Sequence, residues 1–169
     1  VRTGFLSRND ATHALKSTIM KTLEYPMAAT TMNQKQWRYI MAPILTASLP
    51  KMGFVRTLPR TLVYGPADLV GLGVMEPWHN QHLTQLQVLL EEADSASITG
   101  DLIRASMEQM RLEVGLGGSP FDWSPKAFTL ATDCWLKTLI LYARENDISW
   151  TNSLSDLPTL RRNDQHLID

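Results

Sequence analysis

The sequence predicts an all-α or nearly all-α fold of five or more helices. Apolar residues recur at intervals of three and four in several long segments, which is the spacing of one helix face. Proline and glycine, together with Ser, Thr and Asn, separate these segments and mark helix ends. Of the 169 residues, 44% are hydrophobic and 20% are charged, as in ordinary globular proteins. We therefore expect helices packed on helices.

Residues 9–24 form the first predicted helix. Its apolar residues recur at every fourth position: Ala11, Leu15, Ile19, Leu23. Asn9 can cap the helix, because its side chain can accept hydrogen bonds from free backbone N–H groups. Pro26 ends it, since the residue before a proline is pushed out of the α region.

A second helix is predicted from Thr31, which has capping-box spacing to Gln34, as far as Pro50. Its apolar stripe is long: Trp37, Ile40, Met41, Ile44, Leu45, Leu49. Pro43 lies inside this stripe and predicts a kink or a break. Residues 54–66 are then predicted to form an extended basic connector, which could include a short edge strand.

Three further helices are predicted over residues 78–93, 100–114 and 133–145. The first has four leucines on its expected buried side: Leu83, Leu86, Leu89, Leu90. The other two have candidate terminal residues: Thr99 and Thr132 as N-caps, and Gly115 as a left-handed residue after the second. One more short helix could follow Ser149.

Charge is unevenly divided along the chain and suggests two regions. Residues 1–67 contain nine Lys and Arg but only Asp10 and Glu24 as acids, a net charge of +7. Residues 68–169 contain seven basic and fifteen acidic residues, a net charge of −8. We predict a basic helical region followed by an acidic one, which could pack together as one domain. The first can neutralise phosphates, whereas the second would repel them.

The basic region also carries aromatic residues, and this combination is typical of nucleic-acid binding. Lys and Arg neutralise phosphates, while aromatic faces can stack on exposed bases. Trp37 lies in an apolar stripe, which favours a core position for this residue. The residues predicted to contact the backbone of RNA or an RNA–DNA duplex are all basic: Lys16, Lys21, Lys35, Arg38, Lys51, Arg56, Arg60.

No pattern in the sequence predicts a catalytic residue or a cofactor site. The glycine-rich segments, residues 71–73 and 115–118, lack the spacing of phosphate-binding loops and are predicted to be turns. Cys134 has no protease signature around it, so an inert thiol is expected. The tightest group of carboxylates lies at a predicted helix end, where solvation is expected: Glu91, Glu92, Asp94.

Glu76, His79 and His82 share one predicted helix face at intervals of three residues. They could bind zinc if a further ligand approached them. The His-Glu-x-x-His spacing is absent and no cysteine lies nearby, so a polar helix face is the favoured interpretation. No metal ligand is therefore assigned.

The ends of the chain and its single cysteine bear on where the protein acts. The first four residues include neither an initiator methionine nor a signal-peptide core, which predicts a fragment of a longer protein. No apolar run approaches the roughly 20 residues of a membrane span, so no membrane partner is expected. Cys134 cannot form an internal disulfide, and an intracellular location, in cytoplasm or nucleus, is expected.

Several short blocks occur in a recognisable order: residues 3–11, 24–31, 40–45, 49–51, 63–66, 71–74, 99–106 and 132–137. Together they resemble the region downstream of the palm in reverse transcriptases of non-LTR retrotransposons. The resemblance extends to about residue 146. One departure is Val70, which stands where the family's Gly-Gly-Leu-Gly signature has its first glycine.

The resemblance implies a function. In such enzymes the helices after the palm form the thumb, which grips the template–primer duplex, and this role is implied for about residues 1–50. The catalytic aspartates lie upstream, so none is carried over, and the implied partner is an upstream polymerase domain of the same polypeptide. The alternative is a helical protein–protein interaction module with no nucleic-acid role, whose basic and acidic parts dock on each other or on a partner protein.

Overall fold

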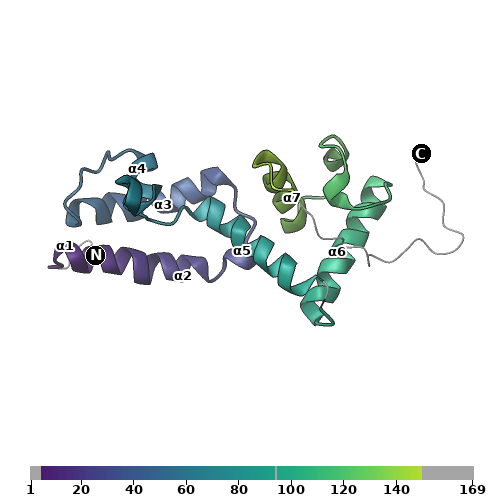
Figure 1. Ribbon diagram of the computed structural model, residues 1–169, viewed down its shortest axis with the longest axis horizontal. Coiled ribbons are helices and arrows are strands. Elements are labelled where there is room, and N and C mark those ends of the chain that lie inside the picture. The colour runs from purple at the N-terminus through teal and green to yellow at the C-terminus, as the bar shows by residue number, and fades with distance from the viewer. Residues whose placement is uncertain (1–4, 94, 150–169) are drawn as a thin grey trace, which may run out of the picture. The chain divides into compact units, whose positions relative to one another are not determined.

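The computed structural model describes residues 5–93 and 95–149 (Figure 1). Helices account for 67% of these residues, and none of them lies in a β-strand. The all-α prediction is therefore confirmed. The short helix expected after Ser149 lies outside the described residues. Within these two ranges, no helix combines the length and the apolar character that crossing a membrane requires.

The chain divides into two compact units, Val1–Leu83 and Thr84–Asp169. The division falls inside one helix, α5 (Pro77–Glu92), whereas charge suggested a boundary between residues 67 and 68. The residues from 68 to 83 therefore pack with the basic region rather than with the acidic one.

The first unit begins with a continuous helical stretch in three parts: α1 (Arg8–His13), the π-helical η1 (Ala14–Ile19) and α2 (Met20–Glu24). A capping box starts this stretch at Ser7. Ser7 Oγ accepts a hydrogen bond from the Asp10 N–H (3.2 Å), and Asp10 Oδ2 accepts one from the Ser7 N–H (3.3 Å). The N-cap expected at Asn9 is therefore wrong by two residues.

The π-helical segment moves the buried face of this stretch by one position. The sequence predicted Ile19 on that face, four residues after Leu15. Hydrogen bonds in a π-helix span five residues instead of four. Met20, five residues after Leu15, is buried at 3% exposure, whereas Ile19 is only half-buried. Backbone hydrogen bonding here overrides the apolar period of the sequence.

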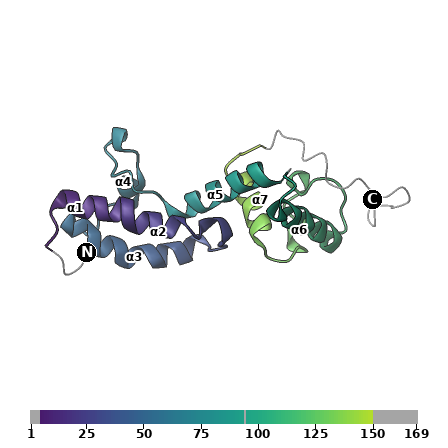
Figure 2. The same ribbon diagram turned by 90° about the horizontal axis from the view of Figure 1, so that it is seen from below.

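Helix α3 (Gln34–Lys51) runs alongside this stretch (Figures 1 and 2). Its N-cap is Asn33, whose Oδ1 accepts a hydrogen bond from the Gln36 N–H (2.9 Å), and the cap predicted at Thr31 is wrong. The helix continues through Pro43, so the break considered there does not occur. Its buried residues form one stripe: Trp37, Met41, Leu45, Ser48, Leu49.

The predicted connector contains a short helix, α4 (Arg60–Tyr64), which follows Pro59. Arg60 was expected outside any helix, and this expectation is wrong. After the turn η3 (Ala67–Leu69) the chain returns past the end of α4. Three N–H groups donate to carbonyls at this end: Leu72 to Leu62 (2.8 Å), Gly73 to Gly65 (2.8 Å) and Val74 to Val63 (3.1 Å). These bonds satisfy the terminal carbonyls of the helix and fix α4 against the returning segment.

Two glycines allow the returning segment to approach so closely. A Cβ atom at Gly71 would lie 2.1 Å from the carbonyl oxygen of Gly65 and 2.2 Å from its carbonyl carbon. A Cβ atom at Gly65 would lie 2.7 Å from the carbonyl oxygen of Thr61. The two backbones therefore meet without room for a side chain at Gly71.

Val70 adopts a left-handed backbone conformation, with φ 64° and ψ 12°. A β-branched residue is strained in this conformation, and its side chain is 87% exposed, so packing does not offset the strain. We expect Val70→Gly to raise the free energy of unfolding by about 1 kcal/mol. Thermal unfolding of the full chain measures this change.

The matched control for this prediction is Leu69→Gly. Leu69 is also well exposed, at 75%, but it has no positive φ. Glycine at this site should therefore only add backbone freedom to the unfolded chain and lower the stability by roughly 0.5–1 kcal/mol. If Val70→Gly were as destabilising as Leu69→Gly, Val70 would not be strained.

The core of the first unit lies between the first helical stretch, α3, α4 and the returning segment. Its buried apolar residues are Ala11, Leu15, Met20, Met41, Leu45, Leu49, Met52, Val63 and Val74. Because α4 and the returning segment contribute Val63 and Val74 to this core, packing as well as hydrogen bonding holds α4 in place.

Helix α5 has a partly polar buried side. Gln81, His82 and Gln85 are each 0% exposed. Of the four leucines predicted to be buried, two are buried and two are more than half exposed: Leu86 and Leu89, against Leu83 and Leu90. The prediction is therefore wrong for Leu83 and Leu90. A buried glutamine is tolerated where its amide is hydrogen-bonded, as that of Gln81 is.

The second unit contains the remaining elements: the end of α5, α6 (Ile98–Val114), the 3-10 turns η4 (Pro120–Asp122) and η5 (Ala127–Thr129), and α7 (Trp135–Glu145). Ser97 caps α6 and Cys134 caps α7, so the caps predicted at Thr99 and Thr132 are wrong. Gly115 takes the predicted left-handed conformation, with φ 73°. The largest core residues include Ile103, Met107, Met110, Trp123, Phe128, Leu136, Leu139 and Ile140.

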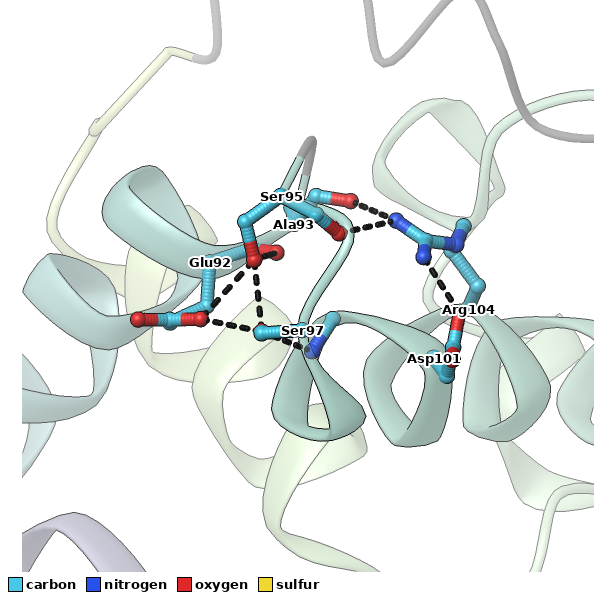
Figure 3. Close-up of polar contacts among 7 residues, drawn as sticks. Glu92, Ala93, Ser95, Ser97, Asp101 and Arg104 are labelled. Carbon is cyan, nitrogen blue, oxygen red and sulfur yellow. Dashed lines mark hydrogen bonds and ion pairs between the residues drawn. The ribbon is translucent and has the colours of Figure 1, made fainter.

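Side chains from both helices hold the turn between α5 and α6 (Figure 3). Glu92 Oε2 accepts hydrogen bonds from Ser97 Oγ and from Ser95 Oγ (2.9 Å), and these two bonds lower the pKa of the Glu92 carboxyl. Arg104 Nη1 donates to the carbonyls of Ala93 (2.7 Å) and Ser95 (3.1 Å). Glu92 and Arg104 therefore have structural partners within the turn.

Candidate nucleic-acid interface

The residues predicted to contact nucleic acid all lie in the first unit. Their positions are Lys16 in η1, Lys21 in α2, Lys35, Arg38 and Lys51 in α3, Arg56 in the following loop, and Arg60 in α4. This unit contains nine basic and four acidic residues, a net charge of +5. The second unit contains seven basic and thirteen acidic residues, a net charge of −6. Each unit therefore keeps the sign of charge of its region, although Asp68 and Glu76 lower the net charge of the first unit from +7 to +5.

Four of these side chains are exposed and form no ion pair with any residue that the structure describes: Lys35, Arg38, Arg56, Arg60. Lys21 is also exposed, but its Nζ lies 2.6 Å from Glu24 Oε2. Lys16 and Lys51 are half-buried. A phosphate that approaches the four exposed cations would not have to displace an ion-pair partner, so they are the strongest candidates for backbone contact.

Arg38 and Arg60 come from different elements and line the same pocket. This pocket, of about 700 Å³, is lined by α3, α4 and the start of α5. Its other lining residues include aromatic, apolar and acidic side chains: Trp37, Met41, Ala42, Tyr64, Glu76, Trp78. The volume lies within the range of about 300–1,000 Å³ that is usual for small-ligand sites.

Hydrogen bonds fix the wall of the pocket at Trp37. The indole is 3% exposed, and its Nε1–H donates to Gln81 Oε1 (2.8 Å). The Thr30 hydroxyl donates to the same oxygen (3.0 Å), and Gln81 Nε2 donates to the Met32 carbonyl (3.1 Å). Trp37 is therefore a core residue, as its position in the apolar stripe predicted, and the pocket wall that it forms is rigid.

Tyr64 lies in the electrostatic field of both arginines. Burial, as the largest cause, raises the pKa of its hydroxyl, and the Glu76 carboxylate raises it further. Arg60 and Arg38 oppose this shift and lower the pKa. The neutral hydroxyl is therefore favoured at neutral pH, and it remains a hydrogen-bond donor inside a pocket of mixed charge.

The zinc alternative is not supported by the positions of its three candidate ligands. His79 Nε2, on the surface of α5, lies 3.5 Å from Oε2 of the half-buried Glu76, which precedes the helix. His82 is buried, and burial lowers the pKa of its imidazole. The hydrogen bond from its Nδ1–H to the Trp78 carbonyl (2.8 Å) opposes this shift. Across residues 5–93 and 95–149, no three His, Cys, Asp or Glu side chains are grouped to hold a metal ion.

Cys134 and Glu91, which the sequence analysis also considered, each accept a hydrogen bond from a neighbouring residue of the chain. Cys134 caps α7, where its Sγ accepts a hydrogen bond from the Lys137 N–H (3.5 Å). Glu91 Oε1 accepts a hydrogen bond from Gln87 Nε2 (2.8 Å) on the surface of α5. Asp94, the third member of the predicted carboxylate group, lies outside the described residues.

The sequence did not indicate that Glu76 and Trp78 lie beside Arg38 and Arg60. The one local signal is Pro77, because proline suits the first position of a helix and so fixes where α5 begins. Their proximity to α3 and α4 depends on the return of the chain after α4, which no local pattern specifies.

Comparisons with protein-family models, with curated proteins and with solved structures found no match to this chain. The charges, the exposed cations and the pocket described above are therefore the structural observations that bear on function.

Proposed function

We propose that the first unit binds the phosphate backbone of RNA or of an RNA–DNA duplex and does not act on it chemically. The observation that carries this proposal is that four basic side chains of the first unit are exposed and form no ion pair among the described residues. Binding of such cations to phosphates releases condensed counterions, which favours association independently of base sequence. The net charge of −6 on the second unit would keep the nucleic acid on the first.

The proposed setting follows the resemblance. We propose that the chain is a non-catalytic helical fragment of a retroelement RNA-directed DNA polymerase. Its first helices would serve as the thumb, contact the template–primer backbone and support the polymerase core. The proposed partner is the upstream polymerase domain of the same polypeptide, and the proposed location is intracellular.

We expect Arg56→Glu to weaken binding to a primer–template duplex by about tenfold at low salt, because it replaces a phosphate contact with a repelling charge. Fluorescence anisotropy of a labelled duplex, titrated with the full chain, measures the affinity. Arg56 lies in a loop and has no ion pair within the described residues, so the substitution should not disturb the fold.

Lys126→Glu provides the matched control. Lys126 is an exposed residue of the second unit that also lacks an ion pair in the described part of the chain. The substitution changes the net charge by the same amount, and the affinity should remain within about twofold of wild type if contacts are confined to the first unit. Equal losses for the two variants would contradict a binding surface on the first unit.

An apolar stripe on α6 favours the second candidate function, a helical protein–protein interaction module. Ile98, Leu102 and Leu112 are 81%, 63% and 76% exposed and lie on one outer face of this helix. For such a module we expect no binding to a duplex even at low salt. Sedimentation velocity over a range of protein concentrations would instead show self-association that Leu102→Glu abolishes.

A further inference from the structure

The lining of the pocket beside α4 carries more positive than negative charge. Arg38 and Arg60 line it without an ion pair to any described residue, and the Tyr64 hydroxyl lies within the influence of both. Glu76 also lines the pocket, and its carboxylate lies 3.5 Å from the His79 imidazole. The lining therefore carries two guanidinium groups and one carboxylate, an excess of positive charge that favours an anion.

The pocket lining also includes aromatic and apolar side chains. Trp37, Met41 and Trp78 line the same pocket as the two arginines. Trp37 and Met41 are only 3% and 2% exposed, so the half-buried Trp78 ring is the one of the three that a ligand can reach. The Trp37 ring is held by its bond to Gln81, and the Trp78 ring packs edge-on against the His82 ring, with 4.1 Å between centroids. These aromatic walls are therefore already ordered before any ligand enters.

We propose that this pocket binds one nucleotide, with its phosphate held by Arg38 and Arg60 and its base lying against the apolar wall. The planar guanidinium group matches phosphate geometry and can donate two parallel hydrogen bonds. The half-buried Trp78 ring can accept the flat face of any base, so the pocket would not select a sequence. This inference rests on the proposed function, because it assigns one nucleotide of the bound strand to a defined place.

Only an unpaired nucleotide can enter such a site. A base within a duplex is stacked and paired, and extruding it requires a few kcal/mol. The pocket would therefore take a base from a single-stranded end or gap next to the duplex that the exposed cations hold. A free nucleotide has the same chemistry as a nucleotide of a bound strand. The comparison of duplexes with and without an overhang, described below, distinguishes these two sources.

The test uses Ala42→Trp, which fills the pocket without changing its charge. Ala42 lines the pocket and is exposed on α3, so a larger side chain can be accommodated outside the core. Thr46→Trp is the matched control, because Thr46 is exposed one turn later on the same helix and does not line the pocket. Arg38→Met removes one charge and keeps an apolar stem, which provides a second variant. Circular dichroism verifies the fold of each.

Isothermal titration of the full chain with adenosine monophosphate, adenosine and inorganic phosphate measures the pocket itself. We expect the monophosphate to bind at least about tenfold more tightly than inorganic phosphate, because it adds a stacked base, and at least about tenfold more tightly than adenosine, because it adds the phosphate contact. Ala42→Trp and Arg38→Met should each lose this binding by about the same factor, and Thr46→Trp should retain it. No binding of the monophosphate, or equal binding by Ala42→Trp, would overturn the proposal.

Duplexes with and without a single-stranded overhang separate the pocket from the backbone surface. If a strand supplies the nucleotide, the overhang should strengthen binding in wild type and in Thr46→Trp but not in Ala42→Trp. Blunt duplex should bind Ala42→Trp as it binds wild type, because the exposed cations remain. Binding of the monophosphate without any effect of the overhang supports the pocket and assigns it to free nucleotides. Binding of the monophosphate without binding of blunt duplex retains the pocket and contradicts the backbone proposal.

Discussion

Gly71→Ala is expected to destabilise the first unit by about 3 kcal/mol or more, the upper range for overpacked sites. The new Cβ atom would lie 2.1 Å from the carbonyl oxygen of Gly65, which is a backbone atom and cannot rotate away. Relief requires the returning segment to separate from α4. The hydrogen bonds from Leu72 to Leu62 and from Gly73 to Gly65 would then be lost.

Hydrogen–deuterium exchange of the full chain is the suitable measurement, because it reports the two units separately. Peptides from α3 and α4 should exchange much faster in the variant, while those from α6 and α7 should be unchanged. Gly73→Ala is the control in the same segment. Its Cβ would find no atom closer than 3.6 Å, so only its φ of 59° opposes alanine, at roughly 1–2 kcal/mol. Equal protection in the two variants would contradict the close contact between Gly65 and Gly71.

Trp37→Ala is expected to lower the free energy of unfolding by about 3–5 kcal/mol, as for other buried aromatic residues. The indole is 3% exposed, and its Nε1–H donates to the buried amide of Gln81. Removing it opens a cavity beside the pocket and takes one of two donors from Gln81 Oε1. Urea unfolding followed by circular dichroism measures the loss without depending on tryptophan fluorescence.

Tyr39→Ala tests whether this effect is specific to the buried ring. Tyr39 lies on the same helix and is 83% exposed. Its removal should change the stability by less than about 0.5 kcal/mol. A small effect of Trp37→Ala, similar to that of Tyr39→Ala, would mean that Trp37 is not part of the core.

The sequence was sufficient to predict the fold class because most helices have an apolar face with a regular period. It was less informative about helix starts, since Ser, Thr and Asn occur close together before them. Asn33 rather than Thr31 caps α3, and Ser97 rather than Thr99 caps α6. All of these residue types can cap a helix, and the path of the entering chain selects one of them.

Burial on α5 depended on partners that are distant in the sequence. Leucine spacing predicted that Leu83 would face the core, but Gln81 does so instead. The Gln81 amide bonds to Trp37 and Met32, so its burial leaves these polar groups satisfied. The spacing of apolar residues takes account of leucines but not of hydrogen bonds between distant residues, which explains why Leu83 was wrongly predicted to be buried.

At the candidate site too, the sequence indicated individual residues but not the contacts between distant segments. The excess of basic residues before residue 68 is visible in the sequence, and it identified Arg38 and Arg60 individually. Their meeting at one pocket was not predictable, because it depends on α4 and on the return of the chain through Gly71. The strained conformation of Val70 in that returning segment was not predicted by any local pattern of the sequence either.

The salt dependence of duplex binding tests the central claim most directly. Affinity for a blunt primer–template duplex should be measured for the full chain between about 50 and 200 mM salt. If the four exposed cations neutralise phosphates, the logarithm of the association constant should fall by roughly 3.6 units for each unit in the logarithm of salt concentration, about 0.9 for each phosphate. A slope near zero, or no binding at the lowest salt, would contradict the proposed backbone interface.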